Sequence, residues 1–211
     1  MNINALLDNK TIALVGPSKS MINAGFGPEI ERHDLVVRLN HQWPINNDLK
    51  SDVGERMDIL YHCCNPDFSM MRFSIPEFQK TKMIFYEQGI QDALLRMICL
   101  EYKIPYVDIT TEYQTLQHQL NTFPNTGLVA IRHLLSFPIR SLKLFGITFF
   151  QEPYYENYLG NGANAKHWEN DTLPKKIDLH QLDVQFAYFL KNFINDSRLA
   201  IDQYSREIMC I

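Results

Sequence analysis

Two histidines near the end of the sequence stand where proton transfer and anion binding are plausible chemistry. His180 lies in the run DLHQLDVQ, near the expected start of a long helix, whose positive end favours a neutral imidazole. A neutral imidazole can take the proton of a hydroxyl group at physiological pH. His167 lies in the run KHWEN, after a segment rich in Tyr, Asn and Gly. A lone histidine is more often structural than catalytic, and the residues alone leave both readings open.

Two short turns have the composition of anion-binding loops. The first, GPSKS, begins at Gly16 and includes Ser18, directly after an apolar run. The second, Asn125-Thr126-Gly127, precedes an apolar helical stretch, so its hydroxyl and amide groups could face an anion. The first loop matches neither GxxxxGK[ST] nor GxGxxG. A turn kept for packing, and an ordinary helix cap with nothing bound, remain the alternatives.

A polar residue at a strand end is the next candidate. Asn40 follows the apolar run of the second expected strand, where its carboxamide could bind a ribose or a base edge. Arg38 lies two residues earlier, and a buried arginine needs a partner. We expect a structural ion pair of Arg38 with Asp34 or Asp52.

Neither a metal site nor a disulfide framework is indicated. No acidic pair of the DxD type follows a strand, and the His and Asp residues have no ligand spacing. The four cysteines form no CxxC pair, and we expect them to pack as small apolar side chains. They are Cys63, Cys64, Cys99 and Cys210.

These residues need a scaffold of alternating strands and helices. Apolar runs predict six strands, at 11–15, 34–39, 58–61, 83–86, 105–109 and 142–147. Helices are expected at about 89–103, 112–120, 127–136 and 178–194. This alternation is typical of an α/β fold, a Rossmann-like, mostly parallel sheet with helices on both faces. Ligands of such sheets bind at the carboxyl ends of the strands.

The whole chain, 1–211, is predicted to form a single domain. The segment at about 151–166, QEPYYENYLGNGANAK, has neither helical nor strand periodicity. Long irregular loops are often lids over active sites, although a surface loop without function has the same composition.

Composition and charge indicate which kinds of partner to expect and where in the cell the protein is located. The net charge is −4 and there is no basic run, so nucleic acid is not expected as a partner. The first ten residues lack a signal-peptide core, and no apolar stretch approaches the ~20 residues needed to span a bilayer. We therefore expect a cytoplasmic protein, for which peripheral contact with a membrane and the oligomeric state stay open.

The order of these motifs resembles the animal-type sialyltransferase family. ALVGPSKS, GFGPEIERHDLVVRLN and DVGERMD are similar to its large sialyl motif, and FPNTG followed by LVAIRHLLSFPIRSLKLFGI to its small one. KHWEN resembles the short third motif, and HQLDVQ the very small motif. The resemblance covers about 11–61 and 123–185 and leaves 62–122 unaccounted for.

The resemblance implies a single-domain variant of the glycosyltransferase A-type fold and an inverting, metal-independent transferase. CMP-sialic acid would be the donor, with no further cofactor, and a glycan or glycolipid hydroxyl the acceptor. His180 would be the general base and His167 would stabilise the departing CMP phosphate. The donor would be bound by Gly16, Ser18, Asn40, Asn125, Thr126, Gly127 and Gly146.

The sequence also departs from the family pattern. Pro17 stands where an Asn usually contacts the nucleotide, Phe123 where a Tyr often reaches the phosphate, and Gln185 where the very small motif has Glu. Ile12 stands where the animal enzymes have the cysteine whose disulfide joins the large motif to the small motif. Together with the lack of an anchor and stem, this predicts a minimal cytosolic version, as expected from a bacterium or virus.

Two other functions stay open at this point. The donor could be another CMP-activated sugar, such as a bacterial nonulosonic acid or Kdo. Alternatively, the chain could bind a CMP-sugar without catalysis, which the changes at Pro17 and Gln185 favour and the presence of both histidines opposes.

Overall fold

A computed structural model describes residues 2–43, 45–64, 78–87, 92–155, 158 and 179–211. In these ranges the elements are α1 (Ile3–Leu7), β1 (Thr11–Val15), η1 (Lys19–Met21), α2 (Gly27–Glu31), β2 (Leu35–Leu39), η2 (Asn47–Leu49), α3 (Lys50–Val53), β3 (Ile59–His62), η4 (Phe78–Lys80), β4 (Met83–Tyr86), α4 (Asp92–Tyr102), β5 (Tyr106–Asp108), α5 (Thr110–Leu120), α6 (Thr126–Leu135), β6 (Ser141–Phe145), α9 (Leu182–Asn192), β7 (Leu199–Ile201) and α10 (Gln203–Met209).

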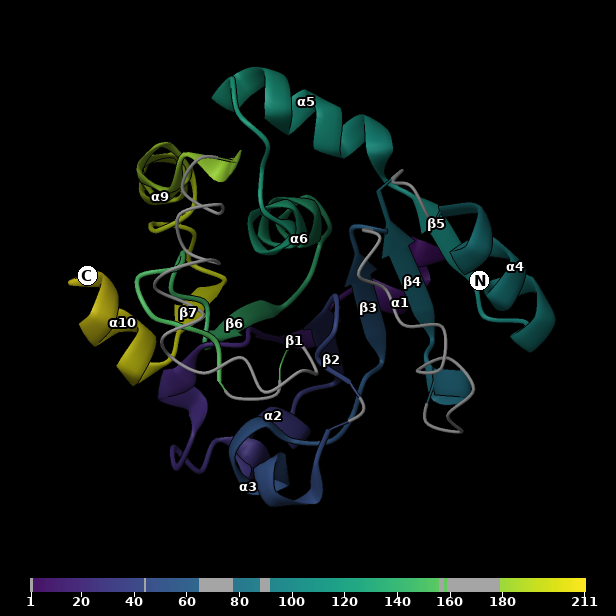
Figure 1. Ribbon diagram of the computed structural model, residues 1–211, viewed down its shortest axis with the longest axis horizontal. Coiled ribbons are helices and arrows are strands. Elements are labelled where there is room, and N and C mark those ends of the chain that lie inside the picture. Colours follow the sequence, from purple (N-terminus) through teal and green to yellow (C-terminus); the bar gives the residue numbers. More distant parts are fainter. Residues whose placement is uncertain (1, 44, 65–77, 88–91, 156–157, 159–178) are drawn as a thin grey trace.

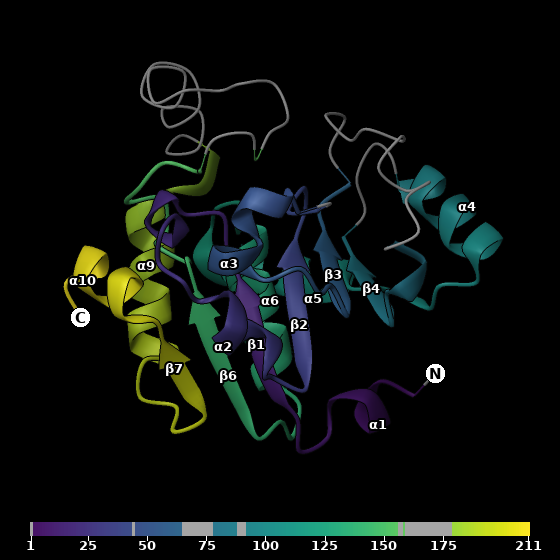
Figure 2. The ribbon, with the colours of Figure 1, turned by 90° about the horizontal axis from the view of Figure 1, so that it is seen from below.

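The strands form one sheet of seven, and every neighbouring pair is parallel. Their order is β5-β4-β3-β2-β1-β6-β7, so the chain reverses its direction of travel across the sheet between β1 and β6. Figure 2 shows the strands from the side, with their carboxyl ends at the same edge. In open α/β sheets ligands bind at such an edge, near the point of reversal.

Helices cover both faces of the sheet, as Figure 1 shows with α5, α6 and α9 on one side and α2 and α3 on the other. The first face packs side chains such as Leu14, Val37 and Tyr61 against α6 and its neighbours. On the opposite face, Ala13 and Val36 pack toward α2 and α3. Because both faces are buried, strands such as β1, β3 and β4 are largely apolar and do not alternate between polar and apolar residues.

The predicted α/β class and all six predicted strands are confirmed, with ends that differ by at most two residues. β7 was missed because its three residues do not form an apolar run long enough to stand out. The short helices α1, α2 and α3 and the C-terminal α10 were also missed. These helices have four to seven residues, fewer than two full turns for each of them, which is too few to display a helical period.

The ion pair expected for Arg38 is wrong. Arg38 is fully buried and donates to two backbone carbonyls, from Nε to Arg56 at 2.8 Å and from Nη2 to Val53 at 2.9 Å. Asp34 instead accepts from the first residue of β1, and Asp52 from two backbone amides before α2. Burial lowers the pKa of Arg38 to about 10, so the side chain stays charged at neutral pH. Its role is structural, as expected, but its partners are backbone carbonyls. These carbonyls lie at or just after the end of α3, where no further turn of the helix supplies N–H groups to them.

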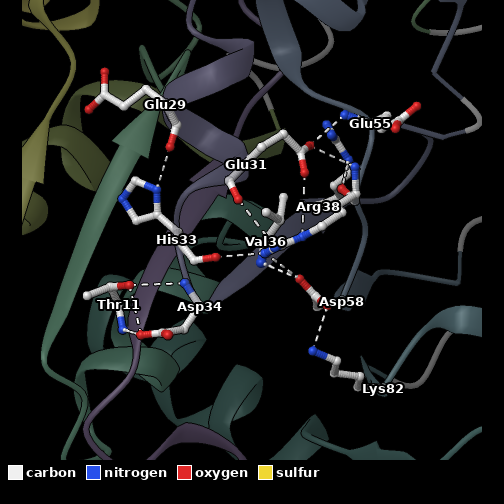
Figure 3. A network of polar contacts seen from close by, with 11 residues as sticks. Thr11, Glu29, Glu31, His33, Asp34, Val36, Arg38, Glu55, Asp58 and Lys82 are labelled. Atoms are coloured by element: carbon white, nitrogen blue, oxygen red, sulfur yellow. Dashed lines mark hydrogen bonds and ion pairs between the residues drawn. The ribbon is translucent and has the colours of Figure 1, made fainter.

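A polar network beside Arg38 joins β2, β3 and β4 at the edge opposite the candidate site (Figure 3). Asp58 accepts from the backbone of Val36 at 2.8 Å and forms ion pairs with Arg56 at 3.0 Å and Lys82 at 2.9 Å. The acidic and basic side chains are therefore paired with each other at this edge. Their contacts help to hold β2, β3 and β4 in register.

The prediction that the cysteines pack as small apolar side chains is confirmed for Cys64 and Cys99 and is wrong for Cys210, which is exposed. All four lie in described residues and none is in a disulfide. Cys64 and Cys99 are buried in the apolar cluster under α4, where burial raises the pKa of both thiols. They pack as small apolar side chains.

Candidate active site at the carboxyl ends of the strands

Asn40 and Thr126 meet at the edge where the parallel strands end. The Asn40 carboxamide donates from Nδ2 to Thr126 Oγ1 at 3.3 Å and accepts at Oδ1 from the backbone N–H of Cys63 at 3.0 Å. Asn40 follows β2 with a φ of 48°, a left-handed conformation that Asn tolerates better than most residues. The structure thus brings together two segments that the sequence selected separately.

Asn125 caps the helix that follows it. Its Oδ1 accepts from the backbone N–H of Leu128 at 2.9 Å, which satisfies one of the unpaired amides at the start of α6. Gly127 is buried in the first turn, and a Cβ there would lie 3.1 Å from Asn125 Oδ1. The helix is held by its apolar, almost wholly buried sequence, so this turn has a fixed position.

His180 has a defined tautomer. Its Nδ1 lies 2.7 Å from the carbonyl oxygen of Phe123, which can only accept, so Nδ1 carries the proton. In the neutral ring the lone pair is therefore on Nε2, the atom that a general base would use. The ring is 8% exposed and stacks on Phe150, with centroids 5.9 Å apart.

The predicted helix at 178–194 begins later than expected. α9 starts at Leu182, and Gln181 precedes it in the left-handed conformation with a φ of 43°. His180 thus precedes the helix cap and does not lie in the first turn. The hydrogen bond to the Phe123 carbonyl places the ring proton on Nδ1, and this does not depend on a position in the first turn of the helix.

The turn after β1 is occupied by a side chain of the protein itself. The Glu152 carboxylate accepts from Ser18 Oγ at 2.6 Å and from the Ser20 backbone N–H at 2.9 Å. The predicted lid begins here, and its first residues are packed: Tyr154 pairs with Ser18, and the Tyr155 amide donates to the Pro17 carbonyl at 2.9 Å. The donors expected to face a ligand anion therefore face Glu152 in this structure.

Gly16 and Gly146 meet where β1 and β6 end. A Cβ on Gly16 would lie 2.3 Å from the Gly146 carbonyl oxygen, and one on Gly146 would lie 2.5 Å from Met21 Cγ. Gly146 also has a φ of 63° and donates its amide to Asp202 Oδ2 at 2.9 Å. Packing between the two loops accounts for both glycines, and a contact of Gly146 with the donor stays a prediction.

Unusual backbone conformations gather around this edge. Phe149, Phe150 and Gln181 all have positive φ, as does Asn40. For a bulky aromatic residue such a conformation is an outlier that costs on the order of 1–3 kcal/mol. Two consecutive phenylalanines in this state, one of them under the His180 ring, indicate that the surroundings of His180 are held at an energetic cost.

Two further residues belong to this edge and were missed by sequence reasoning. Glu87 directly follows β4, is 6% exposed and accepts from Thr126 Oγ1 at 3.4 Å. His62 ends β3, is 2% exposed, and accepts at Nδ1 from the Cys64 amide at 2.9 Å. Burial is the main cause that lowers the pKa of His62, so this ring is neutral. Both residues are polar and come at the end of a buried run, the same signal that identified Asn40.

Glu87 should make the stability of the protein depend on pH. Burial raises its pKa to about 8, against a smaller lowering by the hydrogen bond from Thr126. Between about pH 4.5 and pH 8 the unfolded chain releases this proton while the folded protein keeps it, so stability falls as pH rises, by at most about 1.4 kcal/mol per pH unit. Glu87→Gln keeps the acceptor oxygen but does not titrate. Thermal unfolding should find the variant close to wild type at pH 5 and clearly more stable at pH 8.

The control for this experiment is Glu101→Gln on the exposed side of α4. It should follow the wild-type pH profile throughout. Parallel profiles for wild type and Glu87→Gln would mean that Glu87 is already ionised in the folded protein.

Part of the predicted site lies outside the described residues. His167 and all of the predicted lid after residue 155 except Tyr158 belong to that part. Within the described ranges, no group of three or more His, Cys, Asp or Glu side chains is arranged to hold a metal ion. The helices in those ranges are also too short or too polar to cross a membrane.

Solved structures similar to this chain include a mammalian and a bacterial protein. A mammalian sialyltransferase in complex with Gal-beta-1-3GalNAc-ortho-nitrophenol aligns over 95% of this chain and 71% of its own, with a TM-score of 0.63 and 14% identity. The sialyltransferase CstII from Campylobacter jejuni, in complex with cytidine-5'-monophosphate, aligns over 92% and 80%, with a TM-score of 0.54 and 13% identity. At these identities the likeness shows the fold alone. No curated protein matches the sequence.

Family membership comes from the sequence itself. The model of glycosyltransferase family 29 (sialyltransferase) matches residues 7–136, which contain β1 to β5 and the turn at Asn125. The match includes Asn40, Glu87 and Thr126, the three residues joined by hydrogen bonds at the strand ends. The chain therefore belongs to glycosyltransferase family 29, the sialyltransferases.

Proposed function

We propose that this protein transfers sialic acid from CMP-sialic acid to a hydroxyl group of an acceptor sugar, with inversion at the anomeric carbon. The observation that carries the proposal is the tautomer of His180. Its Nδ1 proton is engaged by the Phe123 carbonyl, which leaves the basic lone pair of the neutral ring on Nε2. The site lies at the strand ends, where such sheets bind nucleotides.

The proposed reaction has a single displacement step. The acceptor oxygen attacks the anomeric carbon from the face opposite CMP, and the bond from that carbon to the phosphate oxygen breaks. The electron pair leaves with CMP, and the acceptor proton passes to His180 Nε2. His167 is assigned to the departing phosphate, where a hydrogen bond or positive charge would stabilise the developing negative charge.

The donor is assigned to the edge formed by Asn40 and the Asn125-Thr126-Gly127 turn. In this turn the amides at the start of α6 point out of the helix, which favours an anion. CstII structures with this fold hold the substrate analogues cytidine-5'-monophosphate and CMP-3FNeuAc, and these ligands support a CMP-sugar as the donor here. Gly16, Ser18 and Gly146 stay assigned to the rim of this site, with Glu152 as the present partner of Ser18.

Release of CMP from a set of CMP-sugars tests the proposal. The purified protein should release CMP slowly from CMP-sialic acid alone and faster when a panel of glycan acceptors is added. Release only from CMP-Kdo or another CMP-nonulosonic acid would move the assignment to that donor. Binding of CMP with no release from any donor would make the chain a binding protein. No metal takes part in the proposed step, so the rate should survive EDTA, and restoration by Mg²⁺ or Mn²⁺ would contradict the mechanism.

A further inference from the structure

Gln185 lies between the two halves of the candidate site and contacts both. Its side chain is fully buried in α9. Oε1 accepts from the backbone N–H of Asn125 at 2.9 Å and from Asn125 Nδ2 at 2.7 Å. Nε2 donates to the carbonyl of Phe123 at 3.1 Å and to the carbonyl of His180. One carboxamide therefore holds the turn assigned to the donor and the backbone of the proposed base.

The Phe123 carbonyl is the centre of this arrangement. It accepts from His180 Nδ1 and from Gln185 Nε2, so its position sets the direction of the His180 ring. Phe123 itself is followed within two residues by Asn125, which Gln185 holds from the other side. A shift of the donor turn would thus move the atom that orients the base.

Only a neutral amide can make these four hydrogen bonds. The amide group has two acceptor lone pairs on one end and two N–H donors on the other. An ionised carboxylate only accepts, and it would face the two carbonyl oxygens of Phe123 and His180 without a donor. Of the described residues that are hydrogen-bonded to the Gln185 side chain, only His180 has a titratable side chain, and it accepts through its backbone carbonyl. The Gln at this position, where the sequence motif predicts Glu, therefore fits its surroundings.

We propose that Gln185 is a positioning residue that couples the donor turn at Asn125 to the base His180, and that it must be a neutral amide to do so. This inference rests on the proposed function, because its effect on rate requires His180 to act in the reaction. Gln185 touches neither substrate in this proposal and acts through the Phe123 and His180 carbonyls.

The ratio of variant to wild-type turnover at each pH tests the coupling. In Gln185→Glu, burial should raise the pKa of the new carboxyl group, and its protonated form can still donate to one carbonyl. The ratio should be nearest to one at pH 5.5 and fall by roughly tenfold or more by pH 8, as expected for a displaced catalytic group. Gln185→Met has a similar length and no hydrogen bonds, so its ratio should be low at every pH.

Matched measurements separate positioning from stability. Gln114→Glu, on the exposed side of α5, adds the same charge away from the site and should keep a ratio near one throughout. Melting temperatures over the same pH range give the folded fraction, so turnover is compared per folded molecule. A ratio near one for both Gln185 variants would overturn the positioning role. A ratio near one for Gln185→Glu alone at pH 8 would overturn the requirement for a neutral amide.

A second readout keeps the inference testable if the enzyme assay fails. Wild-type protein that releases no CMP from any donor would contradict the proposed function, not the coupling. Nuclear magnetic resonance of isotope-labelled histidine reports the His180 tautomer directly. The wild-type ring should carry its proton on Nδ1, and Gln185→Met should lose that preference. An unchanged tautomer in Gln185→Met would overturn the coupling.

Discussion

His180→Ala is expected to lower turnover by roughly 10²- to 10⁴-fold, the usual contribution of a positioned general base. The affinity for CMP should change little, because the proposed base faces the acceptor hydroxyl and not the nucleotide. The measurement is a steady-state rate with CMP-sialic acid and an acceptor, beside a direct titration with CMP. A loss of turnover with an unchanged CMP affinity would show that His180 acts on the transition state and not on the binding of the nucleotide.

Stability has to be measured in the same variant. The His180 ring is nearly buried against Phe150, and its removal also takes one donor from the Phe123 carbonyl. Rates are therefore normalised to the folded fraction, and His118→Ala on the exposed surface of α5 is the matched histidine control. A folded His180→Ala protein with near-normal transfer would remove His180 as the base and leave His167 and Glu87 as the groups to test.

Gly16→Ala is expected to destabilise the protein by about 3 kcal/mol or more, at the upper end of the range for overpacking. The added Cβ would lie 2.3 Å from the Gly146 carbonyl oxygen, which is backbone and cannot move to another rotamer. Relief requires the ends of β1 and β6 to separate, and the sheet holds both strands. Chemical denaturation measures the loss, and thermal unfolding should show a fall of roughly 6–12 °C.

Gly25→Ala is the control that isolates the collision. Gly25 has a φ of 68°, but a Cβ there meets nothing within 4 Å, so its cost is limited to the strained backbone, about 1 kcal/mol. Equal losses in the two variants would mean that conformational strain, and not the meeting of the two loops, limits Gly16. A Gly16→Ala protein as stable as wild type would show that the two strand ends separate easily.

The sequence alone was sufficient to predict six of the seven strands and part of the site's edge. Buried parallel strands need apolar residues on both faces, so runs such as Thr11–Val15 and Met83–Tyr86 stand out from the helices between them. The carboxyl ends of such strands meet at one edge, which placed Asn40 there before any contact was known. The Thr126 turn was selected separately, as the start of a helix. Glu87 and His62 also come at the ends of buried strands, so the same rule could have identified them.

Other features depended on which loops fold over that edge. The carboxylate of Glu152 occupies the donors of Ser18 and Ser20, although more than 130 residues separate them in the chain. The sequence shows that a buried Arg38 needs hydrogen-bond partners. It does not show that these partners are backbone carbonyls, because they come close to Arg38 only when α3 ends beside β2. A periodic pattern encodes which face of an element is buried and gives no information about the partner on that face.

The chemistry of the site divides in the same way. The sequence determined that His180 and Gln185 are five residues apart. His180 lies just before a helix and Gln185 lies within it. Only the tertiary structure decided that both reach the Phe123 carbonyl, because that oxygen belongs to a turn 57 residues before His180. The tautomer of the imidazole and the need for an amide at position 185 both follow from that shared acceptor. Hydrogen bonds between distant segments are set by the packing of α6 and α9 on the sheet, and no local pattern of residues specifies them.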